Sequence, residues 1–192
     1  FVCINIFKPE IHNKTLTPAL QSPWFTPHVI VYMFAYAMLG AATVMAVYLL
    51  WFKKKGIERH EMALCDNLTY VGLAFMTLGM LSGAVWAKAA WGHYWAWDPK
   101  ETWALITMVV YAFILHARFL PALRSDYAFS VMSVLGLASV LMTYFGVNYY
   151  LSGLHSYGGG DTPPGLTAVF ITYACAFALM IYAGYRRVRF GK

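Results

Sequence analysis

The sequence predicts an all-α fold, a polytopic integral membrane bundle of five transmembrane helices. Composition is the first indication, because 60% of the 192 residues are hydrophobic, only 11% are charged and the mean hydropathy is +0.56. A soluble domain is about 45–50% apolar and about 25% charged. The second indication is a set of five long apolar runs, and the third is the gathering of basic residues between them.

Each apolar run is long enough to cross a bilayer, because a spanning helix needs about 20 residues to cross a hydrocarbon core of about 30 Å. The five predicted spans are 29–52, 68–87, 103–120, 128–147 and 166–185. Glycine recurs in the second span, at Gly72, Gly79 and Gly83. Small residues let membrane helices approach closely, so we expect the spans to pack into one bundle.

Lysine and arginine set the predicted orientation. They cluster between the first and second spans, between the third and fourth, and at the C-terminus. These residues are Lys53, Lys54, Lys55, Arg59, Arg118, Arg124, Arg186, Arg187, Arg189 and Lys192. With five spans all three clusters fall on one side, which the positive-inside rule makes cytoplasmic. The net charge of +6 is therefore interpreted as a topology signal and not as a nucleic-acid-binding surface.

This topology divides the chain into three parts. Residues 1–28 are predicted to be an external segment, 29–185 the membrane domain, and 186–192 a basic cytoplasmic tail. The loops 88–102 and 148–165 are predicted to be external. The chain does not begin with Met and no signal peptide is visible at its start, so we expect it to be a processed or truncated piece.

The three cysteines, Cys3, Cys65 and Cys175, lie far apart in the sequence. No CxxC or CxxCH motif occurs. A dithiol redox role and a zinc site are therefore not expected, and the chain is not predicted to be a c-type cytochrome itself.

The segment WGHYWAWDPKETW, residues 91–103, holds four of the seven tryptophans. Its second half predicts the start of a helix. Asp98 can cap the helix, Pro99 suits the first helical position, and Glu101 follows the cap by three residues. On spacing alone, Asp98 and Glu101 are therefore not indicated as an acid–base pair.

Three tryptophans lie near predicted helix ends: Trp24, Trp51 and Trp86. Indoles commonly sit at headgroup depth, so an interfacial belt explains these three. It explains Trp91, Trp95 and Trp97 less well, because they cluster in one predicted external loop. Gathered aromatic faces suit a large planar apolar ligand, so a binding platform is the alternative interpretation.

Two histidines lie near this loop in the predicted topology. His28 is at the outer entrance of the first span, and His155 is in the other external loop. Together they could supply both axial ligands to a haem iron, since neutral imidazole binds iron well. The alternative is that both are ordinary polar loop residues, and His93 inside the tryptophan loop is a competing ligand.

His116 differs because it lies within the third predicted span, near its cytoplasmic end. An ionisable group inside a span is costly and indicates a function. The alternative is an interfacial histidine that is hydrogen-bonded to a backbone carbonyl.

Several of these stretches resemble a known family. WGHYWAWDPKETWALI resembles the tryptophan-rich WWD signature of the haem-handling membrane proteins of cytochrome c maturation. ALQSPWFTPHV, LHAR and VNYYLSGLHSYG are most similar to the CcsA/ResC type, the cytochrome c synthase subunit of bacteria and chloroplasts. The resemblance covers roughly residues 17–185, and the separated motifs agree in order.

The resemblance implies that haem b is held on the outer face, with His28 and His155 as axial ligands of the iron. These two histidines and Asp98 form the implied catalytic set, and a histidine at position 93 is not required. The residues that the resemblance assigns to haem binding are His28, His155, Trp91, Trp95, Trp97, Asp98, Trp103 and His116. His116 would belong to a separate internal haem site, whose second histidine would lie upstream of this sequence.

The implied activity is that of a holocytochrome c synthase, or haem lyase, which joins haem to the CxxCH motif of apocytochrome c. The implied partners are apocytochrome c, a CcsB/ResB-like membrane subunit or fused domain, and membrane lipid, with no nucleic acid. The implied location is the bacterial inner membrane with the WWD loop facing the periplasm, and a plastid thylakoid is less favoured. A CcmC-like haem carrier without lyase activity and a non-haem transporter are the alternatives.

Overall fold

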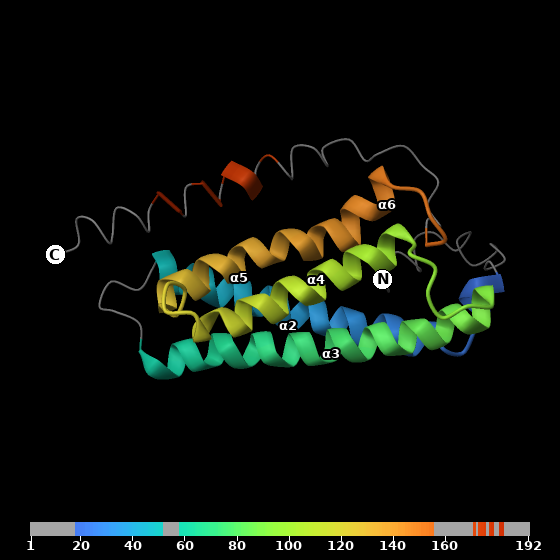
Figure 1. Ribbon diagram of the computed structural model, residues 1–192, viewed down its shortest axis with the longest axis horizontal. Helices are drawn as coiled ribbons and strands as arrows, with labels where there is room; N and C mark the ends of the chain where they lie inside the picture. Colours follow the sequence, from blue (N-terminus) through green and yellow to red (C-terminus); the bar gives the residue numbers. More distant parts are fainter. Residues whose placement is uncertain are drawn as a thin grey trace, which may run out of the picture.

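The computed structural model describes residues 18–51 and 58–155, together with positions 171, 173–175, 177, 178, 181 and 182. Within this part the chain is helical and contains no strand (Figure 1). The predictions for residues 1–17, for the lysines at 53–55, for 156–165 and for the tail 186–192 lie outside the described residues.

The described chain begins with a short 3-10 helix and continues through helices that differ greatly in length. In chain order the elements are η2 (Pro18–Gln21), α2 (Phe25–Trp51), α3 (Arg59–Trp91), α4 (Pro99–His116), η3 (Ala117–Phe119), α5 (Asp126–Leu141), the π-helical segment η4 (Met142–Gly146) and α6 (Val147–Tyr150). Four helical stretches are long and apolar enough to cross a membrane: Phe25–Trp51, Arg59–Trp91, Pro99–Phe119 and Asp126–Tyr150. The predicted class, a membrane protein built from helices, is confirmed.

The four candidate spans coincide with the first four predicted spans. Most of the fifth, 166–185, lies outside the described residues, although the positions described within it are helical. The Tyr173 hydroxyl donates a hydrogen bond to the carbonyl of Val134 on α5, and Phe177 packs against the core. The described part of this segment therefore lies along α5.

The helices extend further than the apolar runs predicted, so the tryptophan loop is shorter than 88–102. Helix α3 continues through an AKAA stretch of mostly strong helix formers. It ends where Gly92 adopts a left-handed conformation, with φ of 84°, and donates its N–H to the carbonyl of Lys88. Helix α4 then begins at Pro99, so the residues between the two helices are 92–98.

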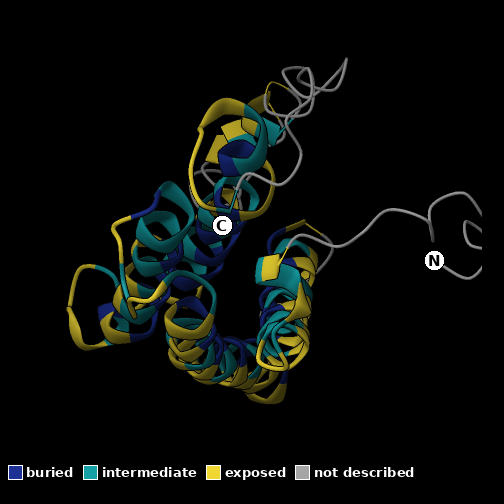
Figure 2. Cartoon of the chain, turned by 90° about the vertical axis from the view of Figure 1, so that its right-hand side faces the viewer, coloured by how far each residue is buried: buried dark blue, intermediate teal, exposed yellow. Residues whose placement is uncertain are grey.

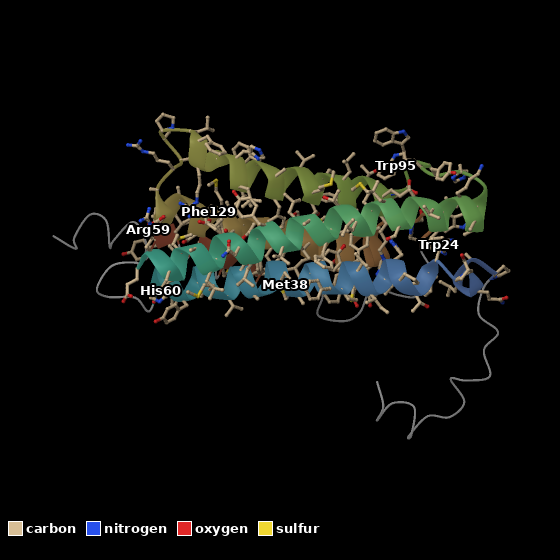
Figure 3. All side chains as sticks on the ribbon, turned by 90° about the horizontal axis from the view of Figure 1, so that it is seen from below. Trp24, Met38, Arg59, His60, Trp95 and Phe129 are labelled. Atoms are coloured by element: carbon tan, nitrogen blue, oxygen red, sulfur yellow. The ribbon has the colours of Figure 1, made fainter. Side chains whose placement is uncertain are left out.

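The long helices run antiparallel to their neighbours in the chain (Figure 1). At one end of the bundle α2 begins, α3 ends, α4 begins and α6 ends. Trp24 and Trp95 lie at this end, whereas Arg59 and His60 lie at the opposite end (Figure 3). The described elements therefore gather the tryptophan loop, the start of α2 and the segment after α6 at one end of the molecule.

Close packing of α2 on α3 depends on the glycines of α3. A Cβ atom added at Gly72, Gly79 or Gly83 would come within 2.8 Å of a side-chain atom of α2. The three side chains that occupy this space are Leu39, Tyr32 and His28. The expectation that small residues bring these helices together is therefore confirmed, and buried residues line the inner faces of the helices (Figure 2).

Arg118 in η3 closes the opposite end of the bundle. Its guanidinium donates to Oδ1 of Asp66 on α3, from Nε at 3.1 Å and Nη2 at 3.0 Å, and from Nη1 to Oδ1 of Asp126 at 3.0 Å. Its Cζ lies 4.3 Å from the ring centroid of Phe129 on α5. One side chain thus joins three consecutive membrane helices at their ends.

We expect Arg118→Met to lower the free energy of unfolding by about 1–3 kcal/mol, because it leaves two carboxylates without their charged donor. The arginine side chain is 25% exposed and Asp66 is 24% exposed, so water compensates the loss only in part. Thermal unfolding in detergent micelles measures the change. The matched control is Arg124→Met, which alters an exposed arginine of the same connection. Equal unfolding midpoints for the two variants would contradict the assigned role.

Candidate haem site

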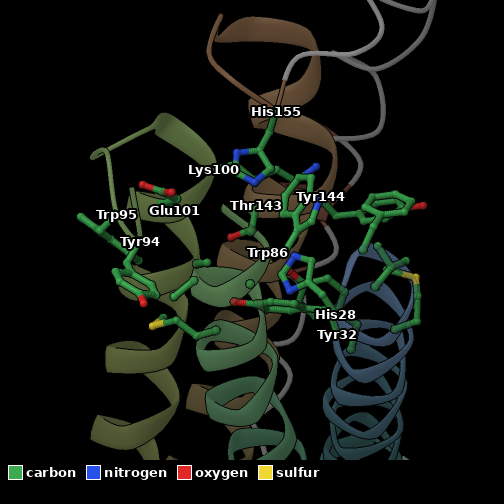
Figure 4. Close-up of a pocket in the computed structure, with 18 residues that line it drawn as sticks. His28, Tyr32, Trp86, Tyr94, Trp95, Lys100, Glu101, Thr143, Tyr144 and His155 are labelled. Carbon is green, nitrogen blue, oxygen red and sulfur yellow. The ribbon is translucent and has the colours of Figure 1, made fainter. Parts of the chain in front are cut away.

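A cavity lies at the end of the bundle that carries the tryptophan loop (Figure 4). It contains about 980 Å³ of empty space, its open mouth included. Helix α2, the last turns of α3, the first turns of α4 and the segment η4 all contribute to its wall. Its lining is largely apolar and aromatic, and it includes His28 and His155. The two histidines singled out from the sequence therefore line the same cavity.

His28 lies in the first turn of α2, so it belongs to the helix and not to the external segment predicted for residues 1–28. Its Nδ1 lies 2.9 Å from the carbonyl oxygen of Gly79. A carbonyl only accepts, so Nδ1 carries the proton and donates it, and Nε2 keeps its lone pair. The ring lies directly over Gly83, where an added Cβ would come 2.5 Å from Cε1.

His155 lies in the segment that follows α6. Its Nδ1 lies 2.8 Å from Oδ2 of Asp98, and the side chain is 13% exposed. Burial lowers the pKa of His155 and the charge of Lys100 lowers it further, while the hydrogen bond to Asp98 raises it, with a net lowering. The imidazole is therefore mostly neutral near pH 7, with its proton on Nδ1 and a lone pair on Nε2.

Asp98 has two roles, of which the sequence predicted one. As predicted, it caps α4: Oδ2 accepts from the backbone N–H of Lys100 at 3.1 Å, and Glu101 Oε2 accepts from the N–H of Asp98 at 3.2 Å. The second role is to hold the segment after α6, since Asp98 also accepts from His155 and from the backbone N–H of Leu154. Its side chain is only 2% exposed. The helix cap and the histidine anchor are the same carboxylate.

Gly153 permits this second role. An added Cβ at position 153 would come 2.1 Å from Oδ1 of Asp98 and 2.9 Å from Cδ of Pro99. The segment could not approach the start of α4 this closely with a side chain at that position.

Trp86 was assigned to an interfacial belt on sequence grounds, and this was wrong. Its side chain is 1% exposed, and its Nε1 donates to the carbonyl of Ala19 at 2.8 Å. Its ring centroid lies 5.5 Å from that of His28, with the planes 20° apart, and 5.3 Å from that of His155. Trp86 therefore links the two histidines (Figure 4).

A sequence signal for Trp86 existed. Gly79, Gly83 and Trp86 are spaced i, i+4 and i+7, so they share one face of a helix. The two glycines were expected to contact a neighbouring helix, and this spacing places Trp86 on the same buried face.

The three tryptophans of the predicted platform have different surroundings. Trp91 contacts Trp86 and His155, with ring centroids 4.7 Å and 4.9 Å apart. Trp95 lines the cavity, and its buried Nε1 has no hydrogen-bond partner among the described residues. Trp97 is 70% exposed and adopts a left-handed backbone conformation, with φ of 57°. Of the three, Trp95 belongs to the cavity wall and Trp91 packs against His155.

Trp103, His116 and His93 do not line this cavity. Trp103 lines an apolar groove between α4 and α5. His116 is exposed at the other end of α4, where its Nδ1 lies 2.7 Å from the carbonyl oxygen of Ala112. His93 is exposed in the tryptophan loop. Among the predicted site residues, the structure brings together His28, His155, Asp98, Trp91 and Trp95.

The sequence did not single out the tyrosines and threonine of the wall. Tyr32 and Tyr36 come from α2, and Thr143 and Tyr144 come from the π-helical segment η4. The single proton of the Thr143 hydroxyl has two carbonyl acceptors, Trp103 at 3.1 Å and Ser139 at 2.8 Å, and the Thr143 and Thr107 hydroxyls share a further hydrogen bond of 2.9 Å. These bonds fix η4 against α4, and π-helical turns are frequent at functional sites.

The donor groups fit a planar ligand that brings its own metal. The described residues contain no group of three or more His, Cys, Asp or Glu side chains that could hold a bare ion. Two imidazoles with free Nε2 atoms suffice as axial ligands when a macrocycle supplies the other four. The unpartnered N–H of Trp95 and the aromatic wall suit the polar and apolar parts of such a macrocycle.

Comparison with known proteins gives consistent results. Residues 1–155 match the family described as cytochrome c assembly protein. The chain is 42% identical over 165 residues to protein NrfI of Wolinella succinogenes, which covers 81% of this chain and 18% of that protein. It is 42% identical over 167 residues to the cytochrome c biogenesis protein CcsA of Chlamydomonas reinhardtii, covering 82% and 47% of the two chains. For CcsA of Atropa belladonna the identity is 37% over 187 residues, covering 78% and 60%. The chain thus spans from about a fifth to three fifths of the length of these relatives.

Proposed function

Since the chain belongs to the cytochrome c assembly protein family, we propose that it acts in cytochrome c maturation by holding haem b between His28 and His155. One observation carries this proposal. Two imidazoles from distant parts of the chain line one cavity, and each has Nδ1 bonded to the protein and Nε2 available. Such outer hydrogen bonds are typical of metal-binding histidines, because they fix the tautomer and the ring orientation.

The proposed reaction joins haem to apocytochrome c. Haem supplies an iron with two axial positions and two vinyl groups, and each cysteine thiol of a CxxCH motif adds its S–H across one vinyl C=C bond to form a thioether. Neither an oxidant nor a nucleophile from this chain is required. The chain acts by orientation, and a well-oriented pair of reactants can lower the barrier by about 7–11 kcal/mol at best.

In this mechanism the two histidines hold the iron, and the CxxCH histidine of apocytochrome c then replaces one of them. Asp98 and Gly79 hold the two rings in place through their Nδ1 atoms. Trp86 and Trp91 pack behind His155 and limit the access of water to it. His116 is proposed to serve a separate internal haem site, away from this cavity, and Trp103 lies in the groove between α4 and α5.

The proposed topology has five spans, with the cavity on the outer face of the membrane. Arg118 and Arg124 belong to the connection at the opposite end of the bundle, which the positive-inside rule makes cytoplasmic. The favoured location is the bacterial inner membrane, although CcsA relatives include those of the alga and plant named above. A CcsB/ResB-like membrane subunit or fused domain is the proposed partner.

Co-expression with an apocytochrome tests the function. The chain would be supplied with the remainder of a CcsA relative and the partner subunit, and the product examined for haem that resists acid–acetone extraction. The expected result is covalent haem on the CxxCH motif. Bound haem without a covalent product would favour the carrier alternative, and the absence of haem from the purified protein would favour the transporter.

We expect Gly83→Ala to weaken haem binding by about tenfold, because the new methyl group would occupy the space of the His28 ring and move Nε2 away from the iron. Titration of the purified protein with ferric haem measures the dissociation constant. The matched control is Gly40→Ala in α2, where an added Cβ has nothing within 4 Å. Equal affinity in the two variants would argue against His28 as a ligand in this position.

A further inference from the structure

Lys100 brings a cation to the wall of this largely aromatic cavity, which Glu101 also lines. It is the second residue of α4, it is half-buried, and it lines the same cavity as His28 and His155 (Figure 4). Its Nζ donates to Oδ1 of Asn148 on α6 at 2.9 Å. An ammonium group has three N–H donors, so this neutral amide accounts for one of them.

The nearby carboxylates are already occupied by other groups. Oε2 of Glu101 accepts from the backbone N–H groups of Ala96 and Asp98. The Asp98 oxygens accept from Leu154, His155 and the backbone N–H of Lys100. Within the described residues the Lys100 ammonium therefore has no ion-pair partner within 4.0 Å.

A partly buried cation without a counterion is unfavourable unless a bound anion compensates it. An anionic group on a ligand that enters the cavity would supply this compensation and would accept from the Lys100 N–H groups that Asn148 does not engage.

On the premise of the function proposed above, we propose that Lys100 binds a propionate carboxylate of haem and so sets the rotation of the macrocycle about its iron. Two axial ligands fix the position and tilt of a tetrapyrrole, but they leave rotation about the axis free. An ion pair at one edge removes this freedom. The edge that carries the vinyl groups is then directed away from Lys100, and Lys100 acts as a positioning residue for the thioether reaction.

The test compares ferric haem with haem dimethyl ester, in which both propionates are neutral. Dissociation constants are measured by absorbance titration of the purified chain and of Lys100→Met, Lys100→Arg and Lys88→Met. We expect Lys100→Met to weaken haem binding by about 10- to 100-fold, the usual worth of a charge-assisted hydrogen bond, and to leave binding of the ester unchanged. Lys100→Arg should keep most of the affinity for haem.

Lys88→Met is the matched control, because Lys88 belongs to the last turn of α3 but donates to the carbonyl of Gly92 and does not line the cavity. Equal haem affinity in wild type and Lys100→Met would overturn the inference, and so would an equal loss for haem and its ester, which would indicate a structural role. A wild-type protein that binds neither compound would instead overturn the proposed function as well.

Discussion

Replacing both His28 and His155 by glycine is expected to abolish the six-coordinate absorption spectrum of bound haem and to lower the haem content of the purified protein about tenfold or more. Both Nε2 atoms are lost, and no other histidine lines the cavity among the described residues. Absorption spectroscopy and a pyridine haemochrome assay measure the two quantities. Each single variant should retain one ligand and give a weaker, altered spectrum.

Free imidazole gives this experiment a second readout. Each substitution leaves a space of the size of an imidazole beside Trp86, so added imidazole should restore a six-coordinate spectrum in the single variants. His93→Gly is the control, since His93 is exposed in the tryptophan loop and does not line the cavity. If the double variant keeps the haem content and spectrum of the wild type, the axial assignment is wrong.

The second large effect is expected at Asp98. Asparagine caps helices as well as aspartate does, so Asp98→Asn should preserve the start of α4. It removes the carboxylate that accepts from Nδ1 of His155 at 2.8 Å. Loss of such an outer partner typically costs about 10- to 100-fold in metal affinity, and we expect a loss of this size for haem. The less basic imidazole should also make the reduction potential of the bound iron more positive.

Glu101→Gln separates this effect from a general disturbance of the loop. Glu101 forms the other half of the capping box and accepts from the N–H groups of Ala96 and Asp98, without touching His155. Redox titration and haem titration of both variants measure the outcome. If Glu101→Gln shifts the potential and the affinity as much as Asp98→Asn does, the role assigned to the Asp98–His155 bond is contradicted.

The sequence was sufficient to predict the membrane-helix class, because hydrophobicity along a spanning helix is a property of contiguous residues. The cap at Asp98 was predictable for the same reason, since its spacing to Pro99 and Glu101 is local. Helix ends were less predictable. Helices extend beyond the apolar runs that predict them. Helix α3 continues for about one turn after its apolar run ends, and helix α2 begins about one turn before its apolar run starts.

Contacts between distant segments could not be predicted in this way. The bond from His155 to Asp98 joins residues 57 positions apart, and the contact of Trp86 with both histidines depends on how α3 faces α2 and the segment after α6. The topology argument put His28 and His155 at the same end of the bundle, but it could not distinguish Trp95, which lines the cavity, from Trp97, which is exposed. That distinction depends on the backbone of the seven-residue loop and its left-handed turn at Trp97.

The way in which the segment Leu151–His155 is attached has a consequence for folding. Asp98 anchors this segment through two hydrogen bonds, and these close a loop that contains the whole of α4 and α5. Closing a long loop costs chain entropy, and a few hydrogen bonds offset only part of it. An iron held by His28 and His155 would close a still longer loop and act as a removable cross-link across the bundle. Haem would then be both the bound substrate and a cross-link between distant segments. Its release to the cytochrome would increase the conformational entropy of the chain.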